Sequence, residues 1–255
     1  MKRSAPWLAI YAVLAYAFLH VPMLILGVFS FNTSRYSMWT GFSLEWYKAL
    51  FRDAQLAEAA GNSLVIAMVS TIVSTAIGTL CAYGLWRRGS KWLSGSLYLS
   101  LVTPEIVTGI SLLAFYQWVF RHLGMRLGMH TVILAHVAFS IAYVVVVVMA
   151  RLRTFDRALE EAAMDLGATE WQAFFRVTLP AILPGVIAAA LLAFTVSIDD
   201  YVITSLVAGV DSETLPMVIY AMARRGISPV VNAISTLIVF GLGVLILFSE
   251  RARAA

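Results

Sequence analysis

Long apolar runs separated by short polar segments dominate the chain. Each run approaches or exceeds the roughly 20 residues that an α-helix needs to cross a bilayer. Stretches such as Val144–Val148 do not alternate apolar with polar residues, as the strands of a membrane barrel would. The pattern predicts an all-α membrane protein with six transmembrane helices in a single domain, residues 1–255. The predicted spans cover residues 7–31, 62–86, 92–120, 131–150, 181–207 and 230–248.

The composition supports a membrane environment and excludes several classes of function. Hydrophobic residues make up 61% and charged residues 13% of the chain, against about 45–50% and about 25% in ordinary soluble domains. No basic patch with interleaved aromatic residues is present, so membrane lipid is an expected partner and nucleic acid is not. Cys81 is the single cysteine, which excludes an intrachain disulfide. No group of residues has metal-ligand spacing, and His20 and His136 are expected to be hydrogen-bonded packing residues.

Lys and Arg are distributed unevenly between the two sides of the predicted membrane. The side that holds the N-terminus carries more of them, because it also receives Arg87–Lys91 and Arg151–Arg157. Since cytoplasmic segments carry the excess of positive residues, both termini are predicted to be cytoplasmic. The first apolar run follows Lys2 and Arg3. With roughly 25 residues it is too long for the hydrophobic region of a cleaved signal peptide, so we expect an uncleaved helix.

The polar segment 151–180 has the pattern of two short helices joined by a turn. Gly167 supplies the left-handed conformation that commonly ends a helix, and Thr169 with Gln172 forms a capping-box pattern that begins the second helix. A hairpin lying on the membrane surface would usually carry Lys and Arg on its polar face. The first helix is acidic instead, which favours docking to a protein partner. Its apolar stripe comprises Phe155, Ala158, Leu159, Ala162, Ala163 and Leu166.

The same segment resembles the EAA motif of ABC importer permeases, in which this loop docks on a cytoplasmic ATPase. Val177 stands where Ile is commoner in that motif. The residues that the resemblance assigns to the coupling loop are Glu161, Ala162, Ala163, Asp165, Gly167, Leu179 and Pro180. Other parts of the chain resemble the spermidine/putrescine branch of these permeases. They are Pro104–Val107, Ser197–Ile203, Leu215–Pro216, Gly226–Pro229 and Asn232–Ala233.

The resemblance implies the fold and the assembly of a type I ABC importer permease in a bacterial inner membrane. The expected partners are a second, different permease subunit, an ATPase dimer and an extracytoplasmic substrate-binding protein. The sequence contains no GxxxxGK[ST] phosphate-binding motif. ATP and Mg are therefore expected on the separate ATPase, with no cofactor, metal site or catalytic residue in this chain. The branch that the chain resembles implies polyamines as the cargo.

Three carboxylates lie inside the predicted spans, which contain no Lys or Arg: Glu105, Asp199 and Asp200. A charge at the bilayer centre costs at least about 2.5–3.5 kcal/mol, so each needs a reason. A water-filled path for cations is one reason; pairing with a partner's basic residue, or protonation, is the other. On a regular helix Asp199 and Asp200 point about 100° apart, so we expect one to line the path and the other to pair or cap locally. The candidate aromatic contacts for a cationic cargo are Tyr201, Tyr116 and Trp118.

Three alternatives stay open on the sequence. The same machinery carries other small solutes in related branches, among them amino-acid derivatives, opines, metals and oxyanions. A secondary transporter without an ATPase is compatible with six spans but leaves the EAA loop without a role. An intramembrane aspartyl enzyme needs two carboxylates that converge from different helices, which the adjacent Asp199 and Asp200 cannot supply on a regular helix.

Overall fold

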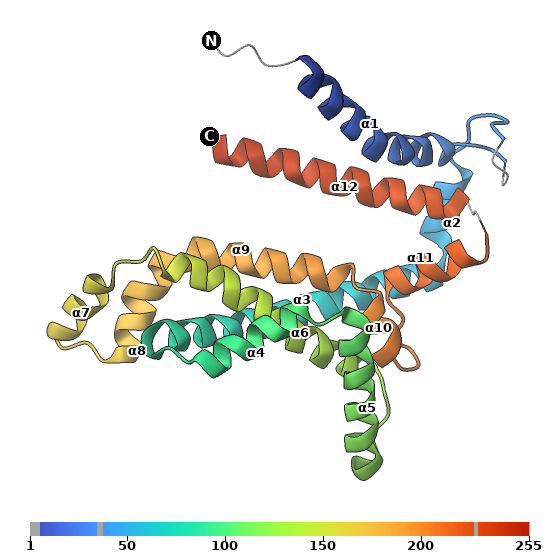
Figure 1. Ribbon diagram of the computed structural model, residues 1–255. Helices are drawn as coiled ribbons and strands as arrows, with labels where there is room; N and C mark the ends of the chain where they lie inside the picture. Colours follow the sequence, from blue (N-terminus) through green and yellow to red (C-terminus); the bar gives the residue numbers. More distant parts are fainter. Residues whose placement is uncertain (1–5, 35–37, 227–228, 255) are drawn as a thin grey trace. The chain divides into compact units, whose positions relative to one another are not determined.

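The computed structural model is built from helices (Figure 1). It describes the backbone of residues 6–34, 38–226 and 229–254, and the side chains of residues 7–34, 38–226 and 229–241. Four residues used in the sequence reasoning, Lys2, Arg3, Ile227 and Ser228, lie outside the described residues. The helices in chain order are α1 (Pro6–Phe29), α2 (Glu45–Arg52), α3 (Ala54–Arg88), α4 (Lys91–Val102), α5 (Glu105–Leu123), α6 (Met129–Leu152), α7 (Arg157–Asp165), α8 (Glu170–Ala173), the π-helical turn η1 (Phe174–Thr178), α9 (Leu179–Ile198), α10 (Val202–Val207), α11 (Leu215–Arg224) and α12 (Pro229–Ala254).

One compact unit combines Met1–Glu58 with Val218–Ala255. Within it α1 lies beside α12, and α12 also contacts α2. The loop after α1 is tied to α2, because the Trp46 indole donates a hydrogen bond of 2.7 Å to the carbonyl of Asn32. Helix packing and this hydrogen bond therefore connect α1, α2 and α12 within the unit.

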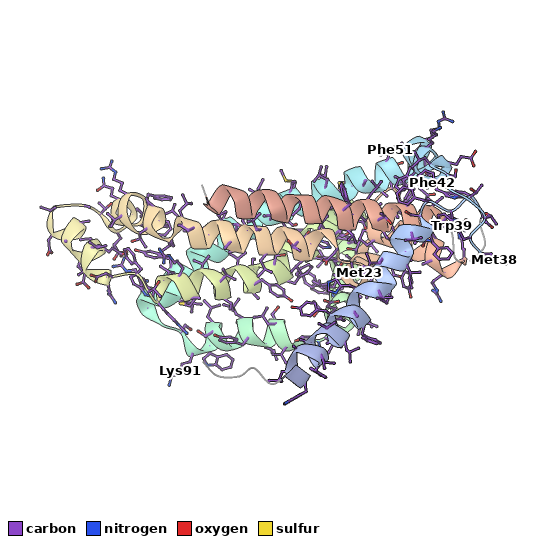
Figure 2. The ribbon with its side chains drawn as sticks, turned by 90° about the horizontal axis from the view of Figure 1, so that it is seen from above. Met23, Met38, Trp39, Phe42, Phe51 and Lys91 are labelled. Atoms are coloured by element: carbon purple, nitrogen blue, oxygen red, sulfur yellow. The ribbon has the colours of Figure 1, made fainter. Side chains whose placement is uncertain are left out.

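Exposed aromatic side chains gather on that loop and on α2. Trp39 and Phe42 come from the loop and Phe51 from α2, and Figure 2 shows them close together with Met38 at one end of the unit. Large aromatic side chains at the end of an apolar helix are typical of the membrane–water interface. We interpret this end of α1 as the level at which the helix leaves the apolar layer.

The other compact unit covers Ala59–Met217 and contains the predicted functional residues. In it α6 packs along α9, α4 lies against α6, and α10 contacts both α5 and α6. α3 meets α6 at Gly78, where an added Cβ would lie 2.6 Å from Val144 Cγ1 and 3.3 Å from the carbonyl oxygen of Ile141. The missing side chain lets the two helices approach closely, as small residues do between membrane helices.

The number of helices that could span a membrane confirms the class of the protein. In the described part of the chain four helices are long and apolar enough, and a fifth span results if the bent pair α4 and α5 is counted as one. The sixth predicted span, 230–248, falls on α12, whose side chains are described only as far as Gly241. Several membrane-spanning helices in an all-helical fold are thus confirmed, while six spans and cytoplasmic termini stay predictions.

The third predicted span is broken at Pro104 instead of running straight. α4 and α5 meet at an angle of 110°. Pro104 has no N–H to donate, and its ring disfavours a helical conformation at the residue before it, so Thr103 is extended with ψ 128°. A proline inside a helical run usually predicts a kink, and the break here is much larger because Thr103 and Pro104 both leave the helix.

The fifth predicted span is broken as well, and this corrects one expectation. α9 ends at Ile198 and α10 begins at Val202, so Asp199 and Asp200 do not lie on a regular helix. The break is stabilised by Asp200, whose carboxylate accepts hydrogen bonds from the backbone N–H of Thr204 at 2.8 Å and of Ile203 at 3.4 Å. A side chain that satisfies these N–H groups starts a new helix. The 100° offset derived for the two aspartates therefore does not apply.

Candidate functional site

The loop 151–180 folds into the predicted helices and turn. Asp156 caps α7 by accepting a hydrogen bond from the N–H of Ala158 at 3.0 Å. Gly167 follows the end of α7 with φ +94°, the left-handed region that a side chain would disfavour. Thr169 and Gln172 form the predicted capping box of α8, with bonds of 2.9 and 3.3 Å between side chain and backbone. The second helix is not separate, because α8 continues through η1 into α9.

Most of the motif residues in the loop are exposed. Glu161, Ala162, Asp165 and Gly167 are exposed and Ala163 is half-buried. The apolar stripe of α7 is also uncovered over part of its length, and Leu166 is 91% exposed. Exposed apolar side chains beside acidic groups are what a docking surface offers a protein partner.

The other two motif residues, Leu179 and Pro180, lie at the start of α9. Leu179 is half-buried against the buried cluster formed by α3, α6 and α9, and Pro180 lies in the first turn of α9. Proline is tolerated there because the first N–H groups of a helix have no partner within it. The motif is thus divided between an exposed part on α7 and a part that begins a membrane helix.

The two helix breaks meet at one pocket. Glu105 at the start of α5 and Asp200 before α10 both line a cavity of about 240 Å³. Its walls include the rings of Phe139 and Tyr143 from α6 and polar side chains beside Pro104. The pocket therefore combines two carboxylates from separate parts of the chain with aromatic and aliphatic surface.

Asp200 is the member of the aspartate pair that caps and pairs locally. Besides starting α10, it accepts a hydrogen bond of 2.7 Å from the Thr204 hydroxyl and lies 3.5 Å from Nε2 of His136. Asp199 is exposed and does not belong to the pocket lining. The sequence predicted that one aspartate lines the path and the other caps or pairs locally, whereas here Asp200 alone both caps α10 and lines the pocket.

A buried polar network extends from Asp200 across four helices. His136 in α6 lies 2.7 Å from the Ser197 hydroxyl through Nδ1 and 2.9 Å from the Thr204 hydroxyl through Nε2. Ser197 in turn lies 3.0 Å from the hydroxyl of Ser70 in α3. The prediction that His136 is a hydrogen-bonded packing residue is confirmed. His20 is hydrogen-bonded to its own helix, through Nδ1 and the Tyr16 carbonyl, but it is exposed.

The predicted aromatic contacts do not line the pocket. Tyr116 is buried against Phe120, Trp118 is exposed on α5, and Tyr201 is half-buried at the start of α10. Tyr143 lines the pocket in their place, and the sequence offered no signal for it because it lies within a continuous apolar run. Sequence reasoning also missed the burial of Glu160, which appeared to be one of several solvated acids on the polar face of α7.

Comparisons with known proteins identify a family and several relatives. The family model described as "Binding-protein-dependent transport system inner membrane component" matches residues 74–252. The chain is 43% identical over 248 residues to the putrescine transport system permease protein PotI of Escherichia coli (strain K12), covering 94% of this chain and 88% of that protein. It is 41% identical over 239 residues to the spermidine/putrescine transport system permease protein PotC of the same organism, covering 92% and 89%.

The fold is also similar to that of a solved transporter. A chain in the crystal structure of a bacterial ABC transporter involved in the import of the acidic polysaccharide alginate matches with a TM-score of 0.74, over 97% of this chain and 96% of that chain. The two sequences are 16% identical, so the likeness concerns the fold alone.

Proposed function

We propose that this chain, which belongs to the family of binding-protein-dependent transport system inner membrane components, is the permease subunit of an ATP-driven importer that carries polyamines. The observation that best supports polyamines as the cargo is the pocket lined by both Glu105 and Asp200. Relatives at 41–43% identity that are named for putrescine and spermidine support the same cargo.

The chemistry of the pocket suits an organic dication. A polyamine has ammonium groups separated by methylene chains, so it needs separated negative groups and apolar surface between them. Glu105 and Asp200 supply the charges, and Phe139, Tyr143 and Ile203 supply the surface. Aromatic faces also attract cations. Carboxylates at membrane depth are expensive and typically mark ion or substrate pathways. We include the exposed Asp199 and the half-buried Tyr201 in the path as residues beside the break.

The exposed loop suits the coupling role. In this proposal α7 docks on an ATPase dimer, which holds ATP and Mg, while this chain holds no cofactor and no catalytic residue. This chain crosses a bacterial inner membrane six times with both termini in the cytoplasm, and a second, different permease subunit faces it there. A loaded binding protein docks on the outer side, closure of the ATPase dimer displaces α7, and access to the pocket alternates between the two sides.

The test is uptake by the reconstituted transporter. The chain is assembled with its second permease, ATPase and binding protein in proteoliposomes, and entry of labelled putrescine and spermidine is measured with and without ATP. We expect ATP-dependent entry of both, with little competition from a neutral diol of equal length. Uptake of an oxyanion or of an amino-acid derivative in preference to the diamines would refute the cargo. Uptake driven by an ion gradient without the ATPase would refute the importer and favour a secondary transporter.

A further inference from the structure

One carboxylate of the loop is buried although its neighbours in the motif are exposed. The Glu160 side chain is 2% exposed, whereas the Glu161 side chain is 58% exposed and forms an ion pair with Arg157 one turn away on the same helix. A buried carboxylate loses its hydration, so it is tolerated only with hydrogen-bonding and charged partners. The identity of those partners shows what Glu160 connects.

The partners of Glu160 belong to membrane-spanning parts of the chain. The Tyr83 hydroxyl of α3 donates to Oε1 at 2.7 Å, and the Thr178 hydroxyl of η1 donates to Oε2 at 2.7 Å. Arg87, one turn beyond Tyr83, places Nε 3.5 Å from Oε1 and donates to the Tyr83 hydroxyl at 3.2 Å. Both carboxylate oxygens thus have a donor, and the charge is balanced by a guanidinium.

Arg87 also contacts the second loop helix. Its Nη1 lies 3.2 Å from Oε2 of Glu170, in the first turn of α8. Because Glu170 is exposed to solvent, this second ion pair is the weaker of the two. Arg87 nevertheless joins the end of α3 to both helices of the loop.

The π-helical turn η1 also connects the loop to α3 and α9. Thr178 is the last residue of η1, and Phe174, its first residue, is buried with its ring 4.5 Å from that of Tyr83. A π-turn inserts an additional residue into a helix and is frequent at functional sites. Here it connects α8 to α9, and its last residue, Thr178, donates the hydrogen bond to Glu160.

We propose that Glu160, Tyr83, Arg87 and Thr178 form a latch that fastens α7 to α3 and to the start of α9. The proposal rests on the proposed function: a displacement applied to α7 by a docked ATPase reaches the spanning helices through these bonds. Glu160 is a positioning residue, because its carboxylate faces the chain's own helices while the exposed groups of α7 face the partner. A weakened latch lets α7 move without α3 and α9, so hydrolysis proceeds with less transport.

The first experiment measures putrescine uptake and ATP hydrolysis together in the reconstituted transporter. We expect Glu160→Gln to lower the number of molecules transported per ATP by about threefold or more, the range typical of mutations that disturb a coupling network. Thr178→Val, which keeps the shape and removes the donor, is expected to lower the ratio in the same direction. Thr178→Ser retains the hydroxyl and is expected to restore most of it.

The ratio separates coupling from a merely structural role. Glu58→Gln, an exposed glutamate in the first turns of α3, is the control that leaves the ratio unchanged. An unchanged ratio in an assembled Glu160→Gln complex would overturn the latch. A parallel fall of uptake, hydrolysis and assembled complex would overturn it too, since that result means only that the fold was weakened.

A second measurement tests the latch without any cargo. Spin labels at Ala158→Cys on α7 and Arg88→Cys on α3, in a Cys81→Ser background, report the separation of the two helices in nucleotide-free and ATP-bound complexes. We expect one narrow distance in both states for the latched protein, and a broad or state-dependent distance after Glu160→Gln. A distance that is equally narrow in the variant overturns the latch. Failure to transport putrescine, by contrast, refutes the proposed cargo and leaves this distance informative.

Discussion

Two adjacent pairs of carboxylates, Glu160–Glu161 in the loop and Asp199–Asp200 at the helix break, are divided in the same way. One member of each pair is buried and holds structure, since the side chains of Glu160 and Asp200 are 2% and 6% exposed. The other member is exposed. Neighbours with the same charge therefore take different roles, and the buried member of each pair is the one that has hydroxyl groups among its hydrogen-bonding partners.

The two buried acids differ in how their charge is satisfied. Glu160 faces a guanidinium, Arg87, which is permanently positive and neutralises it. Asp200 faces hydroxyl and backbone donors at the start of α10 and the imidazole of His136. Glu160 therefore suits a fixed joint. Asp200, which also lines the pocket, keeps negative charge available to a cation.

The largest expected effect separates the two glutamates. Glu160→Ala leaves the donors of Tyr83, Arg87 and Thr178 without their shared acceptor, and breaking a buried pair of this kind costs about 3 kcal/mol or more. Glu161→Ala removes one exposed ion pair and changes stability by at most about 0.5 kcal/mol. Chemical unfolding of the purified full-length chain in detergent measures both. Equal losses would contradict the division of the pair.

The next effect separates the two aspartates. Asp200→Ala removes the cap of α10 and the bond to Thr204, which together stabilise by about 2 kcal/mol. Asp199→Ala, at an exposed position, is expected to stay within about 0.5 kcal/mol of the wild type. The same unfolding measurement applies. A larger loss for Asp199 than for Asp200 would reverse the assignment.

A smaller effect tests the exposed side of the loop. Gly167→Ala places a side chain at φ +94°, in the left-handed half of the backbone map, where it costs about 1 kcal/mol or more and disturbs the turn after α7. We expect less ATPase to co-purify with the variant. Gly84→Ala, at a helical glycine with open space around it, is the matched control and is expected to be neutral or slightly stabilising. Normal ATPase retention by the Gly167 variant would argue against docking through α7.

The smallest effect concerns the exposed acid of the pocket. Glu105→Gln keeps the size of the side chain and removes its charge, so putrescine uptake is expected to show a KM raised about fivefold, equivalent to about 1 kcal/mol for a partly exposed ion pair. Stability is expected to be unchanged. Glu58→Gln serves as the control, and an equal KM for both variants would remove Glu105 from the path.

Much of the fold followed from local sequence. The cap at Thr169 and the turn at Gly167 depend on residues within a few positions of each other, and the structure confirms both. A proline at position 104 indicates that the helix bends there, but the sequence does not give the angle of 110° between α4 and α5. The break before α10 was not visible, because Asp200 could cap a helix or continue one equally well by its sequence.

The candidate site was predicted only in part. The sequence identified Glu105 and Asp200 as costly charges in apolar runs, but it could not show that they line one pocket. It identified the loop through the motif that includes Glu161, and it passed over Glu160. An acid on the polar face of an amphipathic helix looks the same whether water or another helix covers it.

By itself the sequence determined an all-helical membrane protein, its family and the position of the loop that carries the EAA-like motif, since apolar length, motif spacing and helix-ending residues are read locally. Only the tertiary structure decided which carboxylate of each pair is buried. The Tyr83 hydroxyl that donates to Glu160 lies 77 residues from it in the sequence. His136, which lies beside Asp200, is hydrogen-bonded to the Thr204 hydroxyl, 68 residues away. Burial of the Glu160 charge requires donors from other helices, and burial of Asp200 requires the packing of α6 beside its local cap, so both depend on packing and not on local pattern alone.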